Sequence, residues 1–80
     1  MKQELLKAIE LADAGDWNGS HDISQSIEHR FSYWLHANLH REEGDNENAG
    51  YWYERIEMKP FTGDCKAERA AMRVEIEASL

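Results

Sequence analysis

The sequence is poor in cysteine and proline, and it contains no long hydrophobic run. Cys65 is the only cysteine among 80 residues, so no disulfide can form within the chain. An unpaired cysteine is typical of proteins kept in a reducing compartment. The first ten residues, MKQELLKAIE, place charges inside their apolar pattern, which argues against a signal peptide or a membrane span there. We therefore expect a cytoplasmic protein without a membrane-spanning segment.

Positive charge is also scarce. Nine Lys and Arg residues stand against sixteen Asp and Glu residues, which gives a formal net charge of -7 at pH 7 with histidine neutral. The basic residues are scattered, and a phosphate backbone would be repelled by the net field. Nucleic acid and anionic membrane surfaces are therefore not expected as partners. A chain of 80 residues forms one domain with a modest core, and such small domains often depend on a metal or a partner chain.

Helical periodicity is what the sequence does contain. Apolar residues recur at spacings of three and four, and no strand-like alternation is present. Five helices are predicted. The first covers residues 2–14, and the second runs from a cap at Asn18 or Ser20 to about residue 29. The third covers 30–43, the fourth runs from a cap at Asp45 or Asn46 to about residue 58, and the fifth covers 65–79 after a cap within 62–64. The fold class is therefore all-α, in a single domain over residues 1–80.

The first four predicted helices form two copies of one unit. Aligning Gly-Asp at 15–16 with Gly-Asp at 44–45 gives an offset of 29 residues. A small residue, Ser20 or Ala49, follows each glycine five positions later, which resembles the turn of a tetratricopeptide hairpin, although that repeat is usually about 34 residues long. We expect two stacked, tetratricopeptide-like helical hairpins, with residues 65–79 as a capping helix.

Histidine and aromatic residues mark the candidate site. The stretch WLHANLHREEGD, residues 34–45, places His36 and His40 one helical turn apart on one face, with Glu43 close to the same line. The preceding helix supplies HDISQ, and the following helix supplies Trp and Tyr side chains. These elements predict one half-buried pocket, lined by His21, Asp22, Gln25, Tyr33, His36, His40, Glu43, Trp52, Tyr53 and Arg55.

Three segments, HDISQ, WLHANLHREEGD and NAGYWYERI, together resemble an uncharacterised family of short bacterial helical proteins. Its members read approximately A-H-D-x-x-Q, then W-[IL]-H-A-x-L-H-R-x-E-G-D-x-x-N-A-x-Y-W-Y-x-R. The resemblance covers about residues 15–60, with Ser20 in place of the usual alanine. It implies no activity. It implies only that the following residues fall on the positions of the family motif: His21, Asp22, Gln25, His36, His40, Arg41, Glu43, Asn48, Tyr51, Trp52, Tyr53 and Arg55.

Three interpretations of the histidines remain open. H-x-x-x-H on a helix offers two metal ligands that His21 or Glu43 could complete, although the H-E-x-x-H of zinc proteases is absent. Acid–base catalysis needs only a histidine beside a carboxylate. A hydrogen-bonded network of His, Trp and Tyr would serve packing alone, and it is favoured. We therefore expect a helical binding or interaction module without a cofactor. The alternative is a metal-binding protein or an enzyme that uses His21, His36 and His40.

Three further expectations concern residues outside the histidine cluster. The helix dipole is expected to lower the pKa of Cys65 at the start of the last helix. Arg41 and Arg55 are expected to pair with carboxylates on a solvated face. The last helix carries two apolar stripes, one of Ala67, Ala71, Val74 and Ala78 and the other of Met72, Ile76 and Leu80. One stripe can pack against the rest of this domain, and the other stripe can pack against a second copy of the chain. This arrangement suggests a homodimer.

Overall fold

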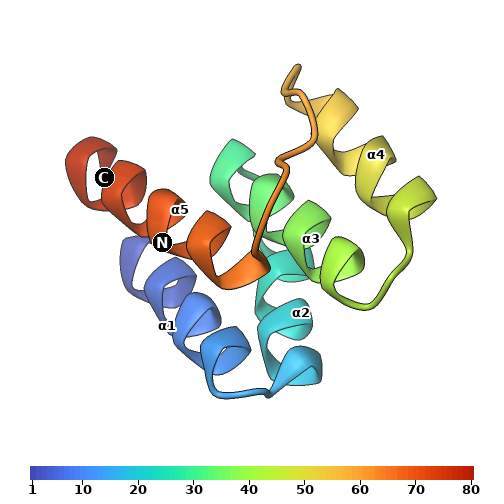
Figure 1. Cartoon of the computed structure of the whole chain (residues 1–80). Helices are drawn as coiled ribbons and strands as arrows, with labels where there is room; N and C mark the ends of the chain where they lie inside the picture. The colour runs from blue at the N-terminus through green and yellow to red at the C-terminus, as the bar shows by residue number, and fades with distance from the viewer.

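The computed structural model describes all residues, 1–80, and consists of helices without any strand. The helices are α1 (Lys2–Asp13), α2 (Trp17–Ser26), α3 (Arg30–Glu42), α4 (Asn46–Arg55) and α5 (Cys65–Ser79). α1 and α2 form one hairpin, α3 and α4 form a second, and α5 lies along α1 and α3 (Figure 1). The predicted all-α class with five helices is confirmed. No helix combines the length and the apolar character needed to cross a membrane.

The two hairpin turns have nearly the same backbone conformation. Gly15 and Gly44 are left-handed, with φ of 90° and 88°, which a glycine adopts without strain. The next residues, Asp16 and Asp45, have φ/ψ of -90°/77° and -93°/75°. Each of these aspartates donates its N–H to a carbonyl five residues earlier, at 2.8 Å and 2.9 Å respectively. The 29-residue repeat in the sequence thus corresponds to one turn used twice.

The aspartate of the first turn also begins α2. The Asp16 carboxylate accepts the N–H of Gly19 at 2.9 Å, so Asp16 is the N-cap and the prediction of Asn18 or Ser20 is wrong. A Gly-Asp pair can end one helix through its glycine and begin the next through its carboxylate. The connection between the helices is therefore shorter than predicted.

Two helices end about three residues earlier than predicted. α2 stops at Ser26, because Ile27 is extended with φ -114° and ψ 124°. His29 then caps α3 instead of ending α2, since its Nδ1 accepts the N–H of Phe31 at 3.1 Å. α4 stops at Arg55, and Glu57 follows in the left-handed region with φ 54°. The connection from α4 to α5 is correspondingly longer.

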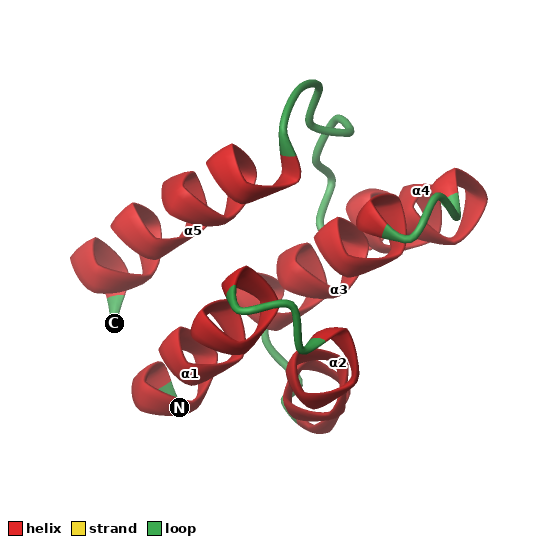
Figure 2. Cartoon of the chain, turned by 60° about the horizontal axis from the view of Figure 1, so that its bottom comes forward, coloured by secondary structure: helices red, strands yellow, loops and turns green.

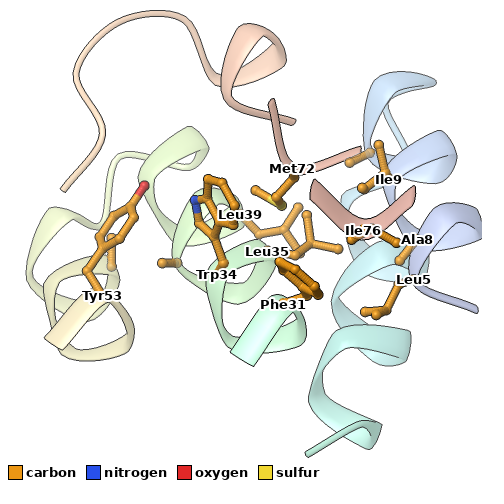
Figure 3. Packing of buried hydrophobic residues seen from close by; sticks show 13 residues of the cluster. Leu5, Ala8, Ile9, Phe31, Trp34, Leu35, Leu39, Tyr53, Met72 and Ile76 are labelled. Atoms are coloured by element: carbon orange, nitrogen blue, oxygen red, sulfur yellow. The ribbon is translucent and has the colours of Figure 1, made fainter. Parts of the chain in front are cut away.

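The hydrophobic core is centred on α3, which lies between the other helices (Figure 2). Residues 34–40 are all buried, so both faces of α3 are covered. Figure 3 shows α1, α3 and α5 side chains meeting in one cluster, with Tyr53 at its edge. The cluster consists of Leu5, Ala8, Ile9, Ala12, Phe31, Trp34, Leu35, Ala37, Leu39, Ala49, Tyr53, Met72 and Ile76. The histidine face of α3 is buried because α2 and α4 pack over it.

The two stripes of α5 have different surroundings. Met72 and Ile76 are buried within the chain's own core. Ala67, Ala71, Val74 and Ala78 face solvent, and the side chain of Val74 is 68% exposed. The small-residue stripe is therefore free to contact a second chain, as is Leu80 at the end of the other stripe, which is 45% exposed. The homodimer stays a prediction.

A buried carboxylate fastens α5 to α3 and α4. Glu68 is fully buried, and its two oxygens accept hydrogen bonds from Trp34 Nε1 (2.8 Å), Asn38 Nδ2 (2.8 Å), Arg41 Nη2 (3.0 Å) and the hydroxyl of Tyr53. The indole nitrogen of Trp34 and the hydroxyl of Tyr53 point toward one another in Figure 3. Four donors around one carboxylate offset much of the cost of burying its charge. The expectation of a solvated Arg41 is wrong, because its partner lies inside the domain.

A second buried ion, Arg69, extends the same network to α1. It is 2% exposed and donates to Asp13 Oδ1 (2.7 Å), Asn38 Oδ1 (3.0 Å) and Glu42 Oε1 (2.8 Å). Burial alone would lower the pKa of Arg69, but the hydrogen bonds to Asp13 and Glu42 raise it overall. The network determines how α5 lies on the two hairpins, since each donor reaches its acceptor in only one position of the helix.

Candidate metal centre

Three histidines from two helices form one cluster. His36 and His40 share a face of α3, and α2 packs across this face and adds His21. One ring nitrogen of each histidine lies within 4.8 Å of the other two. The closest pair is Nε2 of His21 and Nε2 of His36, which are 3.0 Å apart. The cluster depends on the crossing of α2 over α3 as well as on the spacing within α3.

Aromatic neighbours hold the rings in place. His36 and His40 are only 6% and 7% exposed. Trp17 stacks on His21 with 4.7 Å between ring centroids, and Trp52 stacks on His36 with 4.1 Å. His36 also stacks on His40 at 4.9 Å. The two buried rings, His36 and His40, therefore lose little rotational freedom when they bind a ligand.

Trp17 is absent from the residues predicted for this site. Its Nε1 donates to the carbonyl of Leu39 at 2.7 Å, which ties the start of α2 to α3. Trp17 precedes His21 by four residues on the same helix, so the spacing that pairs His36 with His40 would have found it. The late predicted start of α2 left Trp17 outside the helix.

Burial lowers the pKa of two histidines in the cluster, His36 and His21. It lowers the pKa of His36 to about 4, and the nearby rings of His21 and His40 add to the shift. Burial, followed by His40, also lowers the pKa of His21, while the negative charges of Asp22 and Glu43 work against this shift. At pH 7, His21 and His36 are therefore uncharged, the form in which an imidazole nitrogen binds a metal.

Two carboxylates lie on the outer side of His40. Nδ1 of His40 is buried, makes no hydrogen bond within the protein, and is 3.8 Å from Oε1 of Glu43. His40, Glu43 and Asp45 form a second group whose ligand atoms lie within 4.8 Å of one another. Nδ1 of His36 is likewise buried without a partner. A small movement of Glu43 would bring its carboxylate into hydrogen-bonding range of His40.

The other predicted pocket residues divide into three sets. Gln25, Tyr33, Trp52 and Arg55 border a hollow that shares His36 with the histidine cluster. Asp22 is exposed, and its negative charge opposes the lowered pKa of His21. Tyr53 points to Glu68 and not to the histidines. Arg55 lies over the rings of Tyr33 and Trp52 and pairs with no carboxylate, so its expected ion pair is wrong.

Cys65 does not join the cluster. Its thiol is a member of neither group of potential metal ligands. Burial raises the pKa of Cys65, and the opposing charge of Arg41 is too weak to reverse this. The expected lowering by the helix dipole is therefore wrong, because desolvation of the thiolate dominates. The chain's one thiol is not activated as a nucleophile.

Comparisons with protein-family models, with curated proteins and with solved structures gave no significant match.

Proposed function

We propose that this small helical protein binds one divalent transition-metal ion, with zinc as the reference ion, through His21, His36 and His40. The observation that carries the proposal is the gathering of three imidazole nitrogens within 4.8 Å on two packed helices. Three histidines with an open fourth position form one of the recurring zinc sites in proteins. The sequence favoured a purely structural network, and the geometry supports the metal-binding alternative better.

The spacing of the nitrogens is close to that of a zinc site. With Zn–N bonds of about 2.0–2.1 Å, two ligands of a tetrahedral ion lie about 3.3 Å apart. Nε2 of His21 and Nε2 of His36 are 3.0 Å apart, and the remaining separations stay below 4.8 Å. Rotation of the partly exposed His21 ring would bring the set together around one ion.

Nδ1 of His40 has a carboxylate nearby that can accept a ring proton, whereas Nδ1 of His36 has no acceptor within the protein. Without metal, the 3.0 Å contact between His21 and His36 is an N–H···N hydrogen bond, with the donor set by the tautomer. An ion would replace this bond and leave protons on the Nδ1 atoms. Glu43 is positioned to accept the proton of His40 Nδ1, since metal-bound histidines usually donate to an outer carboxylate.

Metal binding is tested by unfolding and titration of chelator-treated protein. Zinc at about 100 times its Kd should stabilise the fold by about 2.7 kcal/mol, which raises Tm by roughly 10–20 °C in a domain of this size. Calorimetric titration should give one ion per chain. Magnesium should have no effect, because it prefers oxygen ligands.

The decisive variant is His21→Ala, because His21 is the least buried ligand and its loss should leave the helices intact. It should remove the gain in Tm from zinc while keeping the helical circular dichroism of the wild type. His29→Asn is the matched control, since asparagine also caps α3 and His29 lies in neither cluster. A full zinc response in His21→Ala, or no response in the wild type, would overturn the proposal.

A further inference from the structure

An unfilled space adjoins the histidine cluster. It is a hollow of about 330 Å³ between α2, α3 and α4, and it shares only His36 with the cluster. The lining residues are Ser24, Gln25, Ile27, Glu28, Tyr33, His36, Trp52 and Arg55. At about 30 Å³ per water molecule, this space suits a ligand of roughly ten non-hydrogen atoms.

One wall of the hollow is aromatic. Trp52 lies nearly parallel to His36, with 19° between the ring planes, and Tyr33 lies beside Trp52 at 5.4 Å. Trp52 and His40 each stack on His36, and they do not stack on each other. Flat groups pack well against such a wall.

Two opposite charges border the same space. The guanidinium of Arg55 lies 4.6 Å from the ring centre of Tyr33 and 5.0 Å from that of Trp52, and it makes no ion pair. Glu28, just before α3, also borders the hollow and makes no ion pair. The side-chain amide of Gln25 forms no hydrogen bond within the protein either. The hollow is thus bordered by one cation, one anion and one amide on exposed residues, and none of the three makes an ion pair or a side-chain hydrogen bond within the protein.

We propose that this hollow binds a small zwitterion with a flat side chain, in the class of free aromatic amino acids. Arg55 would pair with the ligand carboxylate, Glu28 with its ammonium group, and the side chain would lie along Trp52 and Tyr33. A zwitterion has no net charge, so the net charge of -7 on the protein does not repel it. This site goes beyond the proposed metal binding and does not depend on it.

The test is calorimetric titration of chelator-treated protein with phenylalanine, phenethylamine and phenylpropionate. The last two each lack one charge of the amino acid. Phenylalanine should bind several-fold more tightly than either analogue. Arg55→Gln should weaken phenylalanine roughly fivefold, as expected for an exposed ion pair, and leave phenethylamine unchanged. Glu28→Gln should have the mirrored effect, weakening phenylalanine and sparing phenylpropionate.

The controls separate this site from the metal centre and from general charge effects. Arg30→Gln removes an exposed arginine that lies over Phe31 and outside the hollow, and it should bind phenylalanine like the wild type. His21→Ala should also keep phenylalanine binding, even though it loses zinc. The proposal is overturned if the wild type binds none of the three compounds at millimolar concentration. Equal affinities for all three, or wild-type affinity in Arg55→Gln and Glu28→Gln, would also overturn it.

Discussion

The lowered pKa of His36 makes the stability of the metal-free protein depend on pH. An unfolded histidine has a pKa of about 6.5, whereas His36 in the folded chain has a pKa of about 4. Between these values the unfolded chain binds more protons than the folded one, so acid favours unfolding. The neutral ring contributes its full stability above pH 6.5, and this contribution is lost as the pH falls toward 4.

The size of the effect follows from the two pKa values. At about pH 5 the unfolded histidine is almost fully protonated, while folded His36 is about one-tenth protonated. Linkage then gives a loss of about 2 kcal/mol between pH 8 and pH 5 from His36 alone. The lowered pKa of His21 adds to the loss in the same direction. Domains of this size have a total stability of about 4–12 kcal/mol, so the loss is easily measured.

Urea unfolding followed by circular dichroism, with a chelator present, measures this loss at both pH values. The matched variant is His36→Phe, whose ring can still stack on Trp52 and His40 but cannot be protonated. Acidification should cost His36→Phe about 2 kcal/mol less than the wild type, whatever its stability at pH 8. Equal losses in the two proteins would refute the argument that the folded site keeps His36 neutral.

Three further predictions concern the rest of the chain. Glu68→Ala should lower the free energy of unfolding by about 3–5 kcal/mol, because it strands the buried donors around this carboxylate. Urea unfolding measures this loss, with the exposed Glu75→Ala as the control. A loss no larger than that of the control would contradict the network. Glu57→Gly should raise the free energy of unfolding by about 0.5–1 kcal/mol, since φ of 54° strains any residue with a Cβ, and an equal gain from Glu57→Ala would argue against that cause. If the exposed stripe of α5 forms a homodimer, sedimentation should give a dimer at micromolar concentration and Val74→Glu should give a folded monomer, whereas a monomeric wild type would contradict the dimer.

The helices and the two hairpin turns could be predicted from the sequence because their causes are local. Apolar spacing indicated the helices, and Gly15 and Gly44 marked the left-handed turn residues that the structure contains. The pairing of His36 with His40 is also local, since four residues make one helical turn. The helix ends were less accurate because Asp16 and His29 each cap a helix that the periodicity placed differently.

The polar interior was decided by the tertiary structure. Glu68 has the sequence context of an ordinary surface glutamate, and it is buried only because Trp34, Asn38, Arg41 and Tyr53 from two other helices direct donors at it. These partners are 15 to 34 residues away along the chain. The same holds for the site, where His21 meets His36 across 15 residues because α2 packs over α3. Local patterns determine which residues form helices and turns, whereas the partners of buried charges and of the histidines depend on how the helices pack against one another.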